Sequence, residues 1–398
     1  MKYNFDQPID RYNTASSKWD GAEASFGAGA KGAIPMWLAD MDFAVPQPVI
    51  EELKKRTEHG IFGYPMLTNS YYDAVINWMD RRHNWPVKRE WIHLAPRVIS
   101  VFNFLVQAYT KEGDGIAIQS PVYPPFTNCI VNNDRQVVRN CLKFEDGRYT
   151  MDYEDLEKKI TDNAVKMLFL CNPHNPVGRV WTKSELTKLG EICLKHKVLV
   201  VSDEVHADLT FTGFVTTPFA TISEEIAQNT IVCTSPNKTF NLAGLHTSNI
   251  IIPNGELGQI FNSYLKKLHL IQPNIFGSLS TEIAYKTGEE WLEQLKDYLQ
   301  QNLDYLTEFI HNNINDIKVV KPEGTYLIWL NCRGLGMEDE TLSQFMLEQA
   351  KVACYNGYTF GPGGEGFLRM NIACTRATLK EALTRMELAI NRYKRSGG

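Results

Sequence analysis

The sequence lacks the features that mark several specialised classes of protein. Its eight cysteines include no C-x-x-C pair, which argues against a zinc knuckle or a redox motif and predicts reduced thiols. The 41 basic residues do not outnumber the 46 acidic ones, so the formal charge is -5. A protein without a basic excess gains little from releasing counterions, and nucleic acid is therefore not expected as its partner.

Long apolar runs and targeting signals are missing as well. No apolar stretch approaches the length of a membrane span, and residues 1–20 show no basic segment followed by an apolar one. The nine histidines form no H-E-x-x-H motif and no compact cluster, so no metal site is predicted. We expect a cytoplasmic protein with no membrane contact.

One glycine motif carries no function despite its spacing. Gly27, Gly29 and Gly32 form a G-x-G-x-x-G pattern. A dinucleotide site needs a strand before these glycines and a βαβ unit around them, and the sequence predicts neither. We interpret the segment as a flexible arm.

What is present is a repeated alternation of short apolar runs and amphipathic stretches between about residues 90 and 252. This alternation predicts an α/β fold with a mainly parallel sheet. The expected strands are Gly115–Gln119, Val165–Cys171, Val198–Ser202, Thr230–Thr234 and Asn249–Ile252. The expected helices between them are Ile99–Lys111, Thr182–His196 and Leu257–Leu268, the second opened by a capping box of Thr182 and Glu185.

The C-terminal third has a different pattern. Helical periodicity runs from Trp291 to Val319, and strand-like runs follow at Gly324–Leu330 and Gly366–Ile372 before a closing helix over Arg376–Lys394. This pattern predicts a smaller α+β domain. The expected division is an N-terminal arm of the small domain over 1–45, a large domain over 46–285 and a small domain over 286–398.

Polar side chains follow three of the predicted strands where each strand ends. Asn175 comes after the strand ending at Cys171, Asp203 after the strand that ends at Ser202, and Lys238 after Thr234. Ligands of open α/β sheets bind at this edge, so the three side chains are expected to converge. An amide, a carboxylate and an amine suit a pyridine ring that carries a phenolic oxygen and an aldehyde. The helix starting near Val98 offers free N–H groups to a phosphate.

Several longer motifs carry a family resemblance. They are PVYPPF (121–126), NPHNPVGRVW (172–181), SDEVHADL (202–209), SPNKTFNLAGL (235–245), FLRMNIA (367–373), WLADMDF (37–43) and FGYP (62–65). Over nearly its full length the chain resembles fold-type I pyridoxal-phosphate enzymes, in particular the cystathionine β-lyase group that includes the maltose-regulon repressor protein. The resemblance implies a large domain with a mainly parallel seven-stranded sheet between helices, and a smaller α+β domain.

The resemblance also implies roles for single residues. Lys238 is the residue that binds pyridoxal 5'-phosphate covalently, and it is catalytic together with Tyr123, which stacks on the ring. Asp203 faces the pyridine nitrogen, and Asn175 the phenolic oxygen. The residues that contact the phosphate are Val98, Ile99 and Ser235, and those that contact the rest of the cofactor are His206 and Tyr64 of the second subunit. The residues that contact the substrate are Arg369, Trp37, Ala39 and Tyr326, and Arg369 binds its carboxylate through two hydrogen bonds.

Each of these residues has a structural alternative. Lys238 could be an ordinary solvent-exposed lysine, Asp203 could cap a helix, and Arg369 could form an ion pair with a surface carboxylate. Tyr123, Tyr64 and Trp37 could be packed aromatics. Two positions depart from the family pattern: Arg97 stands where a small residue is usual, and Asn237 where Ser is commoner. Arg97 either adds charge to the phosphate site or points outward.

The implied activity is α,β-elimination by a C–S β-lyase. Cystathionine or a cysteine-S-conjugate would yield a thiol, pyruvate and ammonia, with homocysteine as the thiol from cystathionine. The implied assembly is a homodimer with shared active sites. An aminotransferase is the nearest alternative; His206 argues against it, because many related aminotransferases carry Tyr there. A regulatory protein that binds a transcription activator is a third possibility.

Overall fold

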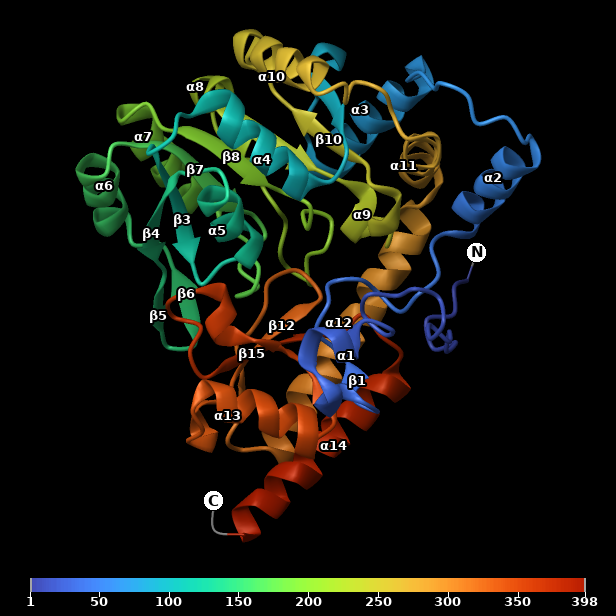
Figure 1. Ribbon diagram of the computed structural model, residues 1–398, viewed down its shortest axis with the longest axis vertical. Helices are drawn as coiled ribbons and strands as arrows, with labels where there is room; N and C mark the ends of the chain where they lie inside the picture. The colour runs from blue at the N-terminus through green and yellow to red at the C-terminus, as the bar shows by residue number, and fades with distance from the viewer. Residues whose placement is uncertain (1, 397–398) are drawn as a thin grey trace.

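The larger part of the molecule is built around a seven-stranded sheet. The computed structural model describes residues 2–396, and the strand order is β2-β10-β9-β8-β7-β3-β4 (Figure 1). Strand β10 is antiparallel to both its neighbours, and the other pairs in the sheet are parallel. The prediction of a mainly parallel seven-stranded sheet is therefore confirmed. The strands are β2 (Ile92–Ala95), β3 (Gly115–Ser120), β4 (Gln136–Cys141), β7 (Val165–Cys171), β8 (Leu199–Asp203), β9 (Thr230–Thr234) and β10 (Ser248–Ile251).

Both faces of this sheet are covered by helices, because its strands are apolar on both sides. Along β7, Leu168 and Leu170 face one core, and Met167 and Phe169 face the other. Helices α6 and α7 contribute to the first core, and α4, α5 and α10 to the second. The helices of this part are α2 (Gln47–Glu58), α3 (Asn69–His83), α4 (Val98–Tyr109), α5 (Pro124–Val131), α6 (Tyr153–Asp162), α7 (Lys183–Lys195), α8 (Glu224–Gln228), α9 (Pro236–Thr239), α10 (Gly255–Lys267) and α11 (Ile275–Thr287).

The predicted capping box is present at the start of α7. The backbone N–H of Glu185 donates to the Thr182 side chain at 3.2 Å, and the Thr182 backbone N–H donates to the Glu185 carboxylate at 2.8 Å. Two donors that a helix start otherwise leaves free are thereby satisfied. This local signal explains why the start of α7 was predictable.

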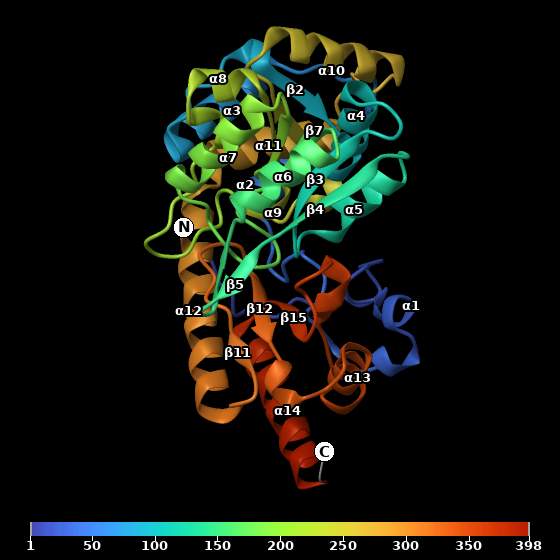
Figure 2. The same ribbon diagram turned by 90° about the vertical axis from the view of Figure 1, so that its left-hand side faces the viewer.

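The smaller part of the molecule lies below the large sheet, and helix α12 runs along both parts (Figure 2). Its antiparallel four-stranded sheet has the order β11-β12-β15-β14. Strand β1 of the N-terminal segment pairs with β13 of this part. The elements are α12 (Glu289–Asn313), β11 (Lys318–Val319), β12 (Leu327–Asn331), α13 (Asp339–Gln344), β13 (Val352–Ala353), β14 (Tyr355–Asn356), β15 (Phe367–Asn371), α14 (Arg376–Arg395) and β1 (Ile34–Pro35), with a separate hairpin of β5 (Lys143–Glu145) and β6 (Arg148–Thr150).

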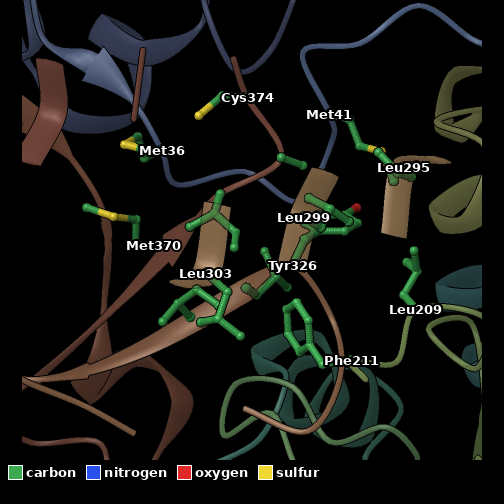
Figure 3. Close-up of a cluster of buried hydrophobic side chains, with 14 of the residues drawn as sticks. Met36, Met41, Leu209, Phe211, Leu295, Leu299, Leu303, Tyr326, Met370 and Cys374 are labelled. Atoms are coloured by element: carbon green, nitrogen blue, oxygen red, sulfur yellow. The ribbon is translucent and has the colours of Figure 1, made fainter. Parts of the chain in front are cut away.

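One hydrophobic core joins the two parts (Figure 3). Met41 of the N-terminal segment, Leu209 of the large part and Leu299 of α12 belong to the same buried cluster as Tyr326 and Met370. Within residues 2–396 the cluster is continuous across the two parts, so no solvated linker separates them there. The loop around Met41 is thereby brought next to the ends of the large sheet.

The glycine-rich segment is folded, and the prediction of a flexible arm is wrong. It contains helix α1 (Ala22–Phe26) and a 3-10 turn over Ala28–Ala30. Ala30 and Ala33 are buried against Leu347 of the small part. The alanines of this segment are interspersed with glycines, which disfavour helix, so no periodic apolar pattern marked this contact.

Candidate active site

A cavity of about 670 Å³ opens at the carboxyl ends of β7, β8 and β9. It is where an open α/β sheet is expected to bind its ligand. Most of the predicted site residues line it: Val98, Ile99, Tyr123, Asn175, Asp203, His206, Ser235, Lys238, Arg369 and Ala39. Segments more than 300 residues apart in sequence therefore meet in one site.

Lys238 is positioned by the turn that follows β9. Ser235 caps the short helix α9, and its hydroxyl accepts the Asn237 backbone N–H at 3.2 Å. The Lys238 Nζ donates to the Ala39 carbonyl at 2.6 Å. Burial lowers the pKa of Lys238 to about 8, although the charges of Asp40 and Asp203 raise it. A larger fraction of this amine is neutral near pH 7 than for an ordinary lysine, which suits a nucleophile and a base.

Asp203 is the last residue of β8 and is buried. One carboxylate oxygen accepts the Val205 backbone N–H at 3.2 Å. Burial raises the pKa of Asp203 to about 7, while that N–H and the charge of Lys238 lower it. A protonated ring nitrogen beside this carboxyl would favour its ionised form, because opposite charges stabilise each other.

Arg369 lies on β15 with only 3% of its surface exposed. Its Nη1 donates to the Asn175 side-chain oxygen at 2.9 Å, and its Nη2 donates to the Trp37 carbonyl at 2.8 Å. The buried Nε has no partner within residues 2–396, and no carboxylate there forms an ion pair with this guanidinium. Burial lowers the pKa of Arg369 to about 10. A buried cation without an anion is costly, so this site is prepared for an anionic ligand group.

His206 and Tyr123 are uncharged side chains of the same cavity. Burial and the positive charges of Lys238 and Arg369 hold the pKa of His206 well below its usual range. The His206 Nδ1 has no hydrogen-bond partner in the described chain. Burial raises the pKa of Tyr123 to about 12, so its phenol stays protonated. Both rings therefore offer neutral polar atoms and flat apolar surface to a ligand.

The start of α4 forms the opposite end of the cavity. Arg97 is its N-cap residue and makes no side-chain capping bond, so the first N–H groups of the helix, at Val98 and Ile99, face the cavity without a cap. Ser235 adds a hydroxyl, which donates to the Thr247 carbonyl at 2.7 Å. The uncapped N–H groups suit a phosphate, and the Ser235 hydroxyl would donate to it by turning from the Thr247 carbonyl.

Trp37 and Tyr326 stand behind the cavity wall. The Tyr326 hydroxyl donates to the Ala39 carbonyl at 3.0 Å. This carbonyl therefore accepts hydrogen bonds from both Tyr326 and Lys238. Trp37 offers its own carbonyl to Arg369, and its ring packs edge-on against Phe26 at 5.2 Å. Neither residue is among those that line the cavity, and both act on the site through neighbouring groups.

Several lining residues were not found from the sequence. Arg11, Ser16 and Ser17 reach the cavity, as does Asp40. Arg11 pairs with Asp40 at 2.7 Å and with Asp42 at 2.7 Å, which fastens the N-terminal segment over the site. The segment has no periodic pattern, and ion pairs 30 residues apart leave no local signal. Only their nearness to the WLADMDF motif could have suggested them.

Tyr64 lies away from this chain's cavity and is 93% exposed. The apolar side chains of Ile61, Phe62 and Met66 beside it are also exposed. They belong to the segment between α2 and α3, which borders a second hollow of about 490 Å³. Contiguous exposed apolar side chains of this kind mark contact surfaces.

The residues present fit pyridoxal phosphate group by group. A buried carboxyl is available for the ring nitrogen, an amine for the aldehyde, the Asn175 amide for the phenolic oxygen and a helix start for the phosphate. In the described residues, no group of three or more His, Cys, Asp or Glu side chains is arranged to hold a metal ion. Over the same residues, no helix combines the length and apolar character that a membrane crossing requires.

The chain is similar to known proteins over nearly its full length. The sequence profile of the family described as aminotransferase class I and II matches residues 36–386. Cystathionine beta-lyase PatB of Bacillus subtilis is 43% identical over 388 residues, which covers 98% of this chain and all of the relative. Protein MalY of Escherichia coli is 31% identical and covers 98% of this chain and 99% of the relative. Cystalysin of Treponema denticola, solved with pyridoxal 5'-phosphate, is 37% identical with a TM-score of 0.95, covering 99% of this chain and 100% of that one.

Proposed function

The chain belongs to the aminotransferase class I and II family, and from that premise we propose that it is a pyridoxal-phosphate-dependent C–S β-lyase. Its substrate is cystathionine or a cysteine-S-conjugate, and its products are a thiol, pyruvate and ammonia. The observation that carries the proposal is the convergence of Lys238, Asp203, Asn175 and Arg369 in one cavity. The similarity in sequence to a relative named cystathionine beta-lyase supports the choice of reaction.

The bound cofactor supplies an electron sink for the pair released when the Cα proton leaves. Lys238 would be freed as an amine when the amino group of the substrate takes its place on the cofactor aldehyde. It then takes the Cα proton, since an amine with a pKa of about 8 is available as a base near neutral pH. The electron pair then expels the sulfur as a thiolate, which takes up a proton. Water releases the remaining three-carbon fragment as pyruvate and ammonia.

Arg369 orients the substrate for this step. Its guanidinium is buried, has a free Nε and is held by Asn175 and Trp37. A substrate carboxylate placed there gains charge-assisted hydrogen bonds and neutralises the buried cation. The Cα–H bond is thereby held toward Lys238, whose Nζ is fixed by the Ala39 carbonyl.

The active unit is a homodimer with shared sites. The apolar side chains around Tyr64 are exposed to water, and contact with a second copy of the chain would bury them. Tyr64 of that copy then reaches the cofactor. The cytoplasmic location stays a prediction.

The test is an assay of the purified protein with pyridoxal phosphate against L-cystathionine and S-methyl-L-cysteine. Thiol, pyruvate and ammonia are measured together with amino-group transfer to a 2-oxo acid. A lyase releases the three products in equal amounts. Amino transfer without thiol release would identify an aminotransferase and contradict the proposal. Absence of both activities, with capture of a transcription activator from cell extract, would favour the regulatory alternative.

A further inference from the structure

Arg97 stands at the phosphate end of the cavity, where the family pattern has a small residue. It precedes the first turn of α4 and lines the cavity together with Val98, Ile99 and Ser235. The site described above does not use this side chain. Its position beside the free N–H groups of Val98 and Ile99 places a cation at an anion-binding helix start.

The direction of the Arg97 side chain is set by His246. The Arg97 Nη2 donates to the His246 Nε2. Partial burial and the charge of Arg97 lower the pKa of His246, so this ring is neutral at pH 7 and its Nε2 lone pair can accept. The residue after it, Thr247, accepts the Ser235 hydroxyl through its carbonyl at 2.7 Å. The pair is therefore tied to the same turn that anchors a phosphate-site hydroxyl.

The charge of Arg97 is not neutralised by the protein. No carboxylate within residues 2–396 lies in ion-pair distance of it, and its Nε and Nη1 make no hydrogen bond there. The hydrogen bond to His246 occupies one N–H of the five that the guanidinium carries. Nη1 and Nε are left to contact a second group, and a guanidinium binds phosphate oxygens well because its N–H groups are planar.

We infer that Arg97, held by neutral His246, is a direct cationic contact of the cofactor phosphate and slows cofactor loss. The inference rests on the proposed function for the identity of the cofactor. It makes the phosphate site of this chain more strongly cationic than one with a small residue at position 97. The competing assignment is that Arg97 contacts a distal carboxylate of the substrate, since it also lines the cavity.

The test compares two ligands that differ only in the phosphate. Apoprotein is titrated with pyridoxal phosphate and with pyridoxal, using the visible absorbance of the bound form, and dissociation rates are measured by dilution. Arg97→Gln should weaken pyridoxal phosphate binding about 10- to 100-fold, as expected for the loss of a charged hydrogen bond, and leave pyridoxal binding unchanged. Arg97→Lys keeps the charge, and its affinity for pyridoxal phosphate should lie between those of the unchanged protein and of Arg97→Gln.

Three further measurements make the test specific. Arg89→Gln removes an exposed arginine that pairs with Asn69 away from the cavity, and it should bind both ligands as the unchanged protein does. His246→Ala should weaken binding of pyridoxal phosphate alone, and less than Arg97→Gln. The phosphorus NMR shift of the bound cofactor should stay constant from pH 6 to 8 in the unchanged protein and move with pH in Arg97→Gln.

The outcomes separate the possible failures. Equal affinities of unchanged protein and Arg97→Gln for pyridoxal phosphate would overturn the inference. Unchanged cofactor affinity combined with a loss of kcat/KM only for substrates with a distal carboxylate would assign Arg97 to the substrate and overturn it as well. Failure of the unchanged apoprotein to bind pyridoxal phosphate at all would refute the proposed function instead.

Discussion

The floor and the rim of the cavity are built in opposite ways. On the floor, Asp203 and Arg369 are buried on two strands, with no ion-pair partner among residues 2–396. On the rim, the exposed Arg97 lies at a helix start and is hydrogen-bonded to the exposed His246. Tyr64 is exposed as well, on a loop away from this cavity. The floor residues are held by strands of one chain, whereas the rim and the loop around Tyr64 leave exposed side chains for the proposed ligand and the proposed second chain.

This difference has an electrostatic consequence. Burial moves the pKa of Lys238 down and that of Asp203 up, which favours the neutral form of each. Tyr64 is exposed and lies outside this buried region. Substitutions on the floor should therefore alter chemistry and pH dependence, and substitutions on the rim should alter affinity and assembly.

Removing Lys238 should have the largest effect. Lys238→Ala deletes both the covalent attachment and the base, so thiol release should fall by at least about 1,000-fold, with loss of the visible absorbance of bound cofactor. Lys267→Ala, an exposed lysine at the end of α10, is the matched control and should keep full activity. Substantial activity in Lys238→Ala would place the chemistry elsewhere.

Arg369→Lys should have the second-largest effect on activity. Lysine keeps the charge and loses the planar fork, so kcat/KM should fall roughly 10- to 1,000-fold, about 1.4 to 4 kcal/mol, with the cofactor spectrum intact. The melting temperature is measured on the same preparation. A destabilised variant with unchanged kinetics would mean that Arg369 only stabilises the fold, through its hydrogen bonds to Asn175 and Trp37.

Mixing two impaired variants tests whether Tyr64 acts in the active site of a second chain. Lys238→Ala and Tyr64→Ala chains are each expected to be impaired, and mixing them should restore activity because one site in each hybrid dimer has both residues. Random pairing predicts recovery of about one quarter of the full activity. No recovery in dimers shown to be mixed would remove Tyr64 from the neighbouring site.

The smallest effect is expected in a stability measurement, the melting temperature of the cofactor-free chain after Asp203→Asn. The pKa of Asp203 is about 7 in the fold and 3.8 ordinarily, so the folded chain binds its proton more tightly. The stability that this carboxyl contributes is therefore present at low pH and is lost as pH rises from about 4 to about 7. Cofactor-free Asp203→Asn should melt at least ~2 °C above the unchanged chain at pH 8, with a smaller gap at pH 5. An equal gap at both values would contradict a raised pKa.

Much of the floor could be predicted from the sequence. The predicted strands Val165–Cys171 and Thr230–Thr234 coincide with β7 and β9. Buried parallel strands are continuous apolar runs, and their ends are marked by an abrupt change to Asn, Asp or Ser. The side chains that follow these strands meet because parallel strands share an edge.

The rim and the N-terminal segment could not be predicted in the same way. Ala39 contributes a carbonyl to Lys238 and Tyr326, and a backbone acceptor has no sequence signature. Arg11 reaches the cavity through ion pairs with residues 29 and 31 positions away. The hydrogen bond that directs the Arg97 side chain comes from His246, 149 residues away, and leaves no local signal in the sequence.

The most direct test of the central claim is to find which lysine carries the cofactor. Purified protein with pyridoxal phosphate is reduced with borohydride, digested and mapped by mass spectrometry. A single label on Lys238, absent after substitution of that residue by alanine, is the predicted result. A label on another lysine, or no uptake of pyridoxal phosphate by folded protein, would contradict the account.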